Sequence, residues 1–465
     1  MQCIRYGVVA LFAITTIGCS TDEVSPTEPA SAKSSGRASS SDIDPDAILV
    51  SSTSQLVDAL TPANAGRIIH VTAGVYNLTA PLNVPDGVTL EGEGVMQFDD
   101  AGLPTGFAPG TRTTLRMTAN VPGNLLKLNN GVTLRSLAIE DLVGRTGNAV
   151  GIMSRSVEDT VHATLDENEI INPNPHVVVL SGGSGCGVYV VTDNPNMGSP
   201  PPAHSEAAVS AKITRSLIRS STAGFGCGVF AFNFAPLSSV SIALAGNVVG
   251  GGMIASGGVS RPDAVRDSKT NIQSRRNLYL NEAPNRCAPV RLGWNVQGGA
   301  GVPAPLLIGA TERNSLRVHS QDDRIEGFTT GVFAAGGRRF FGLPTAGAST
   351  DNTADLELIG TTISTPSCAA GILVADFRLA GAIVANASLV PGDGNTVRAV
   401  IRSVTGSGVR QNLFADVLGP TGPVAPVFRG TGNRLEIAGS PRAFEQTNTA
   451  ISPAPANEFF TSDGK

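Results

Sequence analysis

The sequence is poor in charged residues and in large aromatic rings. Charged residues make up 15% of the 465 residues, against about a quarter in an average protein, and the net charge is only −5. Binding nucleic acid through its phosphates requires a basic surplus, so this balance argues against a nucleic-acid partner. With 54 glycines and 30 prolines, the chain is also unsuited to a coiled coil or helical bundle. One Trp and four Tyr leave little material for a function built on aromatic stacking.

Long apolar runs are scarce too, and the N-terminus holds the most apolar one. It covers residues 7–17, follows Arg5 and precedes Cys19. The run is far shorter than the ~20 residues of a membrane span. A basic residue followed by such a run is typical of an export signal that is removed.

The residues around Cys19 resemble the lipobox of bacterial lipoproteins, in which small residues precede a lipidated cysteine. The resemblance implies that residues 1–18 are a lipoprotein signal peptide and that diacylglycerol on Cys19 anchors the protein to a membrane. Ser20 then favours the outer membrane or the cell surface. Thr16 departs from the pattern, because the family usually has Leu there. The alternative is an ordinary secretory signal, which predicts a periplasmic or secreted protein.

The segment after the signal, residues 19–46, is rich in Ser, Ala, Pro, Asp and Glu and has no apolar periodicity. Such a composition does not form a packed core, so we expect a disordered tether.

A motif of two short alternating strands joined by a polar turn recurs along the rest of the chain. Copies of the first strand begin at Ala163, Ala211, Ile242, Ile272, Leu316, Leu356, Val397 and Leu435. Copies of the second begin at Gly187, Gly228, Gly331 and Gly371. Short strands at such spacings, without long helical patterns, predict an all-β solenoid in which stacked windings bury a continuous core.

Period-2 alternation predicts which side chains face the core of this solenoid. The inward set is Leu316, Val318, Leu356, Leu358, Leu435 and Ile437. The outward set is Arg317, Glu357, Arg398 and Glu436, whose charges alternate in sign. Stacked opposite charges contribute about 0.2–1 kcal/mol per pair, so we expect a structural charge ladder.

The N-terminal part of the body resembles right-handed parallel β-helix proteins of the pectate-lyase-like superfamily. Residues 54–60 match its short capping helix, residues 68–76 its first winding, and residues 84–94 the glycine-rich segment that follows. Residues 131–134 (GVTL) repeat part of that segment. The resemblance implies a right-handed parallel β-helix over residues 47–450, followed by a C-terminal tail at 451–465. This fold hosts lyases, hydrolases and adhesins, so it does not identify an activity.

Polysaccharide lyases of this fold use an Arg or Lys base, usually with an Asp cluster that holds Ca²⁺. The candidate catalytic group is Asp322, Asp323 and Arg324, with Arg317 and His319 just upstream. A second group is Asp263, Arg266, Asp267, Arg275 and Arg276. The favoured alternative for Asp322 and Asp323 is a polar turn, aligned with Asn168, Ser216, Asn247 and Asn277. No Gly-His-Gly element of the glycosidases and no metal-ligand spacing occurs, so no cofactor is expected outside the lyase alternative.

Aromatic and sulfur residues add further expectations. Alternation places Trp294 inward, as a core residue rather than a sugar platform, and predicts an internal stack of Phe225, Phe230, Phe232 and Phe234. Cys186 and Cys227 occupy equivalent positions of neighbouring windings, which allows a disulfide or two buried thiols. Cys287 and Cys368 are expected to stay apart, because a winding near Gly331 lies between them.

Together these features predict an exported, lipid-anchored β-helix protein that binds an extracellular polymer, with carbohydrate as the favoured partner. One alternative is a lyase or glycoside hydrolase acting on acidic polysaccharide. Another is a structural or adhesive module of the cell envelope. The enzyme alternative requires three or more Asp, Glu or Arg side chains that converge in one groove.

Overall fold

The computed structural model describes most of the body of the chain. It covers residues 33–34, 44–154, 156, 158–175, 177–179, 182–192, 206–221, 226–260, 264–287, 291–301, 309–339, 349–369, 374–384, 393–407, 432–439 and 458–462. The predicted signal peptide, Cys19 and nearly all of the predicted tether lie outside these residues.

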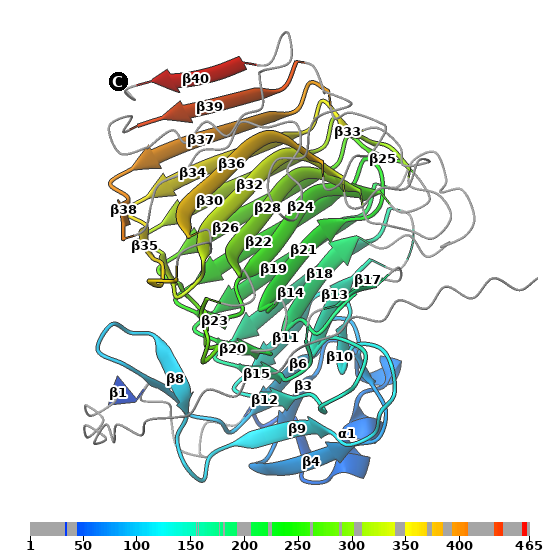
Figure 1. The fold of residues 1–465 in the computed structure, drawn as a ribbon. Coiled ribbons are helices and arrows are strands. Elements are labelled where there is room, and N and C mark those ends of the chain that lie inside the picture. Colours follow the sequence, from blue (N-terminus) through cyan, green and yellow to red (C-terminus); the bar gives the residue numbers. More distant parts are fainter. Residues whose placement is uncertain are drawn as a thin grey trace, which may run out of the picture.

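The body winds into a parallel β-helix with three long sheets (Figure 1). Each winding contributes one strand to sheet I, one to sheet II and one to sheet III, in that order. Sheet I contains β2 (Ile48–Val50), β3 (Ile68–Val71), β6 (Thr89–Gly92), β11 (Val132–Arg135), β14 (Thr160–Asp166), β19 (Ala208–Thr214), β22 (Ser239–Ala245), β26 (Lys269–Arg275), β30 (Ser315–Gln321), β34 (Thr353–Ile359), β37 (Thr396–Arg402), β39 (Arg434–Ala438) and β40 (Glu458–Ser462). Sheet II contains β4 (Gly74–Leu78), β9 (Thr113–Met117), β12 (Ala138–Glu140), β15 (Glu169–Asn172), β20 (Leu217–Ser220), β23 (Val248–Gly250), β27 (Leu278–Leu280), β31 (Arg324–Glu326), β35 (Thr362–Ser364) and β38 (Thr405–Gly406). Sheet III contains β5 (Leu82–Val84), β10 (Leu126–Leu128), β13 (Val150–Met153), β18 (Val188–Thr192), β21 (Val229–Asn233), β24 (Met253–Ser260), β28 (Leu292–Gly301), β32 (Thr330–Arg339) and β36 (Ala375–Val384).

Smaller elements decorate this solenoid. The hairpin of β7 (Met96–Phe98) and β8 (Pro104–Phe107) pairs with β1 (Lys33–Ser34), and its Leu103 packs on sheet II. β16 (Val177–Val179) pairs with β17 (Gly182–Ser184). A short parallel sheet of β25 (Val265–Arg266), β29 (Thr311–Glu312) and β33 (Ser349–Thr350) precedes three strands of sheet I.

A short helix covers the N-terminal end of the solenoid, as predicted. Helix α1 spans Thr53–Ala59, begins with the N-cap Ser52 and buries Leu56 and Ala59. It is followed by the 3-10 turn Pro62–Asn64. At the other end, Glu458–Ser462 lies within the expected tail but pairs in parallel with β39 as β40. The two adjacent phenylalanines of this segment suit a strand better than a tail.

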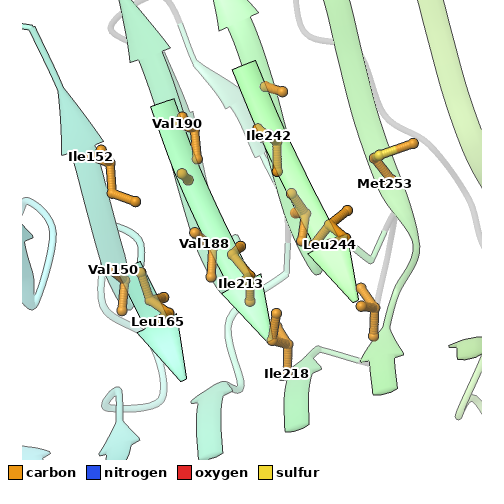
Figure 2. Packing of buried hydrophobic residues seen from close by; sticks show 14 of the residues in the cluster. Val150, Ile152, Leu165, Val188, Val190, Ile213, Ile218, Ile242, Leu244 and Met253 are labelled. Carbon is orange, nitrogen blue, oxygen red and sulfur yellow. The ribbon is translucent and has the colours of Figure 1, made fainter. Parts of the chain in front are cut away.

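One apolar core runs along the inside of the windings. The predicted inward residues Leu316, Val318, Leu356, Leu358, Leu435 and Ile437 are all buried in it. Figure 2 shows Val150, Val188 and Leu244 from different strands packed into the same interior. Trp294 is fully buried and meets Tyr279 edge-on, with ring centroids 5.2 Å apart. Its predicted role in the core is therefore confirmed.

The charge ladder exists, but one of its members differs from the prediction. Arg317 lies opposite Asp355, which lies opposite Arg398 and then Glu436, while Glu357 pairs with His319 one position along. The signs still alternate. Placing Glu357 in the ladder was wrong by two residues, because the connections between successive windings differ in length and the repeat spacing is not constant.

The chain contains two disulfides. Cys186 and Cys227, from neighbouring windings, are bonded with a Cα–Cα distance of 4.6 Å. Cys287 and Cys368 are bonded as well, at 5.6 Å, so the expectation that they stay apart was wrong. The intervening winding does not block them, because only residues 327–329 join β31 to β32. The segment that contains Cys287 passes close to this connection: a Cβ atom added to Gly327 would lie 3.2 Å from Cδ of Arg286, the residue before Cys287.

The phenylalanine cluster lies on the outside of sheet III rather than inside the solenoid. Val229 and Ala231 take the inward positions of β21, so Phe230 and Phe232 must point outward. They are nevertheless buried, and Phe230 stacks on Tyr189 with centroids 4.9 Å apart. Phe234 joins the same cluster, whereas Phe225 lies outside the described residues.

Candidate functional site

Asp323 is a structural member of a buried hydrogen-bonded ladder. Its side chain is fully buried at the corner between sheets I and II. The Asn277 backbone N–H and side-chain amide donate to Asp323 Oδ1 at 2.8 and 3.1 Å, and Ser320 Oγ donates to Oδ2 at 2.6 Å. Burial raises the pKa of Asp323 above its ordinary value. The alternative of a polar turn is the one that the geometry supports for this residue.

The same ladder accounts for the polar residues that align in the sequence. Asn168 accepts from the Leu137 N–H, Asn247 from Ser216, and Asn277 from Asn247. Asp322 stands immediately before Asp323 with φ of 55°, in the left-handed region. Residues in the equivalent place of other windings share this conformation, namely Glu167, Arg215, Gly246, Arg276 and Gly360. Asp322 thus turns the chain at a corner of the solenoid.

His319 and Arg324 lie on different faces of the solenoid. His319 is on the outer face of sheet I, where its Nδ1 lies 3.0 Å from Glu357 Oε2. Arg324 is on the outer face of sheet II and pairs with Glu326 at 2.6 Å. The corner that contains buried Asp323 separates them. The four predicted catalytic candidates therefore do not converge on one site.

The second acidic and basic group is also a corner rather than a site. Asp267 binds the Arg313 guanidinium through both oxygens, at 2.9 and 2.8 Å, and this bond lowers the pKa of Asp267. Asp263 lies outside the described residues. Arg266 precedes Asp267 at the end of β25, whereas Arg275 and Arg276 end a strand of sheet I.

The outer face of sheet III differs from the other two faces in its chemistry. One row of outward residues runs across its strands through Tyr189, Phe230, Ile254, Asn295, Phe333 and Arg378. A second row runs through Val191, Phe232, Ser256, Gln297, Ala335 and Ala380. Rings lie at one end of the first row, and an amide and a guanidinium lie at the other. These two rows contain no carboxylate.

The last three strands of this face, β28, β32 and β36, bring together Asn295, Phe333 and Arg378, which we call the sheet III site. Adjacent parallel strands are about 4.8 Å apart, so the three residues lie side by side. The Arg378 guanidinium carbon is 5.9 Å from the centre of the Phe333 ring, a cation–π distance. Ala335 and Ala380, which flank Phe333 and Arg378 on the same strands, are buried.

Arg378 is partly buried, and desolvation lowers its pKa. Its Nε is buried and has no hydrogen-bond acceptor, and no carboxylate lies within ion-pair distance of Arg378, in the described part of the chain. Gln297 is 1% exposed. Its Nε2 donates to Asn295 Oδ1 at 2.7 Å, whereas its Oε1 has no donor among the described residues. The site thus offers a cation, an unsatisfied amide oxygen and an aromatic ring.

Sequence patterns did not point to this site. The copy of the second strand expected at Gly371 falls largely outside the described residues, and β36 begins instead at Ala375. Arg378 was therefore assigned to no outward row. One member of the site can be found from the sequence. Side chains alternate along a strand, so an inward Trp294 implies that Asn295 faces outward.

The described residues contain no group of three or more His, Cys, Asp or Glu side chains able to hold a metal ion. Among them there is also no helix both long and apolar enough to cross a bilayer.

No protein-family model matches the chain, and no curated protein matches its sequence. Solved structures resemble it weakly. An α-1,3-glucanase from Streptomyces thermodiastaticus is 13% identical with a TM-score of 0.28, and the match covers 89% of this chain but only 65% of the glucanase chain. A PL6 alginate lyase solved with a trisaccharide is 9% identical with a TM-score of 0.28, covering 91% and 87% of the two chains. PfbA, a surface adhesin of Streptococcus pneumoniae, is 10% identical with a TM-score of 0.28, covering 79% and 87%. Similarity at this level identifies no activity for this chain.

Proposed function

We propose that this protein is exported and binds an extracellular polysaccharide on the outer face of sheet III. The observation that carries the proposal is the grouping of Asn295, Phe333 and Arg378 on three adjacent strands of one sheet. Amide and guanidinium groups hydrogen-bond to sugar hydroxyls, and the buried Phe333 ring supports the guanidinium. Strands of a rigid solenoid hold these groups at fixed spacings along a repeating polymer.

Binding is favoured over catalysis by the composition of the same face. General acid–base chemistry needs a titratable group near the reacting bond. The two outward rows of sheet III supply Arg378 but no Asp, Glu, His or Lys among the described residues. Asp376, two residues before Arg378 on β36, is fully buried. The four residues predicted as catalytic lie at the corner between sheets I and II and on the outer faces of those sheets, and only Asp323 among them is buried. Lyase or hydrolase activity remains the second candidate, to be tested on the same polymers through release of unsaturated products or new reducing ends.

Export is supported by the two disulfides, because such bonds persist in oxidising compartments outside the cytoplasm. The lipid anchor on Cys19 is part of the proposal. We expect metabolic labelling with a radioactive fatty acid to mark the wild-type protein and to leave Cys19→Ser unlabelled.

Binding is tested by calorimetric titration of the full chain with neutral and acidic oligosaccharides. We expect Asn295→Ala to weaken binding about tenfold, since one hydrogen bond to a charged or strongly polar partner contributes about 1.5 kcal/mol. Gln273→Ala, an exposed amide on the outer face of sheet I, is the matched control and should leave binding unchanged. Equal loss in both variants, or no binding of any oligosaccharide by the wild type, would contradict the proposal.

A further inference from the structure

Several arginines of the outer faces form ion pairs, whereas Arg378 forms none within the described part of the chain. Arg398 pairs with Asp355 and Glu436, and Arg313 pairs with Asp267. Even Arg145, which is fully buried, is compensated by buried Asp141. Arg378 has neither a carboxylate partner nor an acceptor for its buried Nε in the described part of the chain. A partly desolvated cation without a counter-charge is costly, so such groups are commonly retained to bind something.

The surroundings of Arg378 fix where its guanidinium lies. Phe333, on the adjacent strand, is 6% exposed and supports the guanidinium from one side at 5.9 Å. Ala335 and Ala380 are buried and too small to reach over it. The guanidinium is therefore held against a ring, and its Nε has no acceptor among the described residues. A planar guanidinium in such a place can bind a planar or tetrahedral anion through two hydrogen bonds.

A second unsatisfied group lies two strands away. The Gln297 amide is buried and fixed by its bond to Asn295, and its Oε1 still lacks a donor. The Asn295 amide that holds Gln297 is partly exposed and can hydrogen-bond to a hydroxyl, so the complementary ligand carries an anion at the Arg378 end and a hydroxyl toward Asn295. A bare metal ion would not satisfy both groups, whereas an anionic sugar carries both functions.

We propose that Arg378 binds an anionic substituent, a carboxylate or a sulfate ester, on the sugar that occupies the sheet III site. This inference rests on the proposed polysaccharide binding and names the class of ligand. The anion accepts two hydrogen bonds from the guanidinium, and the sugar ring extends toward the partly exposed Asn295. The ligand class is therefore an acidic rather than a neutral polysaccharide.

The test uses pairs of ligands that differ only in charge, titrated into the full chain. One pair is tetragalacturonate and its fully methyl-esterified form, and the other is sulfated cellotetraose and cellotetraose. We expect the wild type to bind the acidic member of one pair at least tenfold more tightly than its neutral counterpart. Arg378→Gln should remove this preference and Arg378→Lys should keep part of it, because a point charge replaces the fork. Arg402→Gln, which removes an exposed arginine of sheet I, should leave it unchanged.

Each outcome decides the matter. A preference lost in Arg378→Gln and kept in Arg402→Gln supports the inference, and the pair that shows it identifies carboxylate or sulfate. Equal binding of acidic and neutral members overturns the inference but leaves polysaccharide binding standing. A preference that persists in Arg378→Gln, with an unchanged circular dichroism spectrum and melting temperature, also overturns it. Failure of all four ligands to bind would instead count against the proposed function itself.

Discussion

The outer faces of sheets I and III belong to the same windings but differ in how their charged side chains are paired. On sheet I, Arg398 lies in solvent and pairs with Asp355 and Glu436 of the two neighbouring windings. On sheet III, Phe230 and Phe333 are buried, and Arg378 has no counter-charge among the described residues. Ion pairs between neighbouring strands stabilise the stacking of one winding on the next. The uncompensated charge is the feature that needs a ligand to explain it, and the difference separates scaffold from site.

The largest effect is expected from Phe230→Ala, because this ring is 2% exposed and packs between Tyr189 and Phe232. Truncating a buried Phe removes about 3–5 kcal/mol from the free energy of unfolding. Urea denaturation followed by circular dichroism measures this change. Ser241→Ala, an outward residue of sheet I, should alter stability by less than about 0.5 kcal/mol. Similar values for both variants would show that the two faces do not differ.

A smaller loss is expected when the disulfide beside the aromatic cluster is removed. Cys186 and Cys227 pack with Phe230 and Phe232 and close a segment with a sequence separation of 41 residues. The Cys186→Ser, Cys227→Ser double variant should lose about 2–4 kcal/mol in thermal or denaturant unfolding. A double variant as stable as the wild type in non-reducing buffer would show that this bond contributes nothing to sheet III.

The corner between sheets I and II allows a test by pH. Burial raises the pKa of Asp323, so the folded chain holds this proton more tightly than the unfolded chain. The carboxyl therefore contributes stability below its unfolded pKa, and the contribution is lost as the pH rises through the folded value. Asp323→Asn keeps the acceptor for Asn277 without a titrating group. The variant should be more stable than the wild type at pH 7, and the gain should disappear as the pH falls to the unfolded pKa of an Asp, about 4.

If the wild type is more stable than Asp323→Asn at pH 7, the buried hydrogen-bonded ladder at this corner favours the ionised carboxylate, which would contradict the prediction. The companion variant Asn277→Leu removes the side-chain donor instead. It should destabilise the chain at both pH values, because Asp323 then loses its amide donor and the Asn247 N–H loses its acceptor.

The smallest effect is expected on sheet I. Arg398 is 53% exposed, so Arg398→Ala should cost only about 0.2–1 kcal/mol at low salt. The loss should vanish in 1 M NaCl, where charges are screened over about 3 Å. Oligosaccharide binding should not change. A loss of binding in Arg398→Ala would move the site to sheet I.

Most of the fold could be predicted from period-2 alternation and from the repeated motif, because both reflect the local conformation of the chain. Leu316 and Val318 had to face the core once their strand was recognised, and residues 54–60 resembled a cap that the structure contains as α1. Pairing between windings was less predictable. Glu357 was placed opposite Arg317 because a constant spacing was assumed, and Cys287 was kept from Cys368 because the short 327–329 connection was not foreseen. The sheet III site depends on three such registers at once, and no single segment of the sequence contains it.

The most direct measurement is a crystal structure of the full chain with the acidic oligosaccharide that binds most tightly. The account predicts that the sugar lies across β28, β32 and β36, with its anionic group within hydrogen-bond distance of the Arg378 guanidinium. An oligosaccharide bound instead along the charge ladder of sheet I, with Arg378 untouched, would contradict the division between scaffold and site.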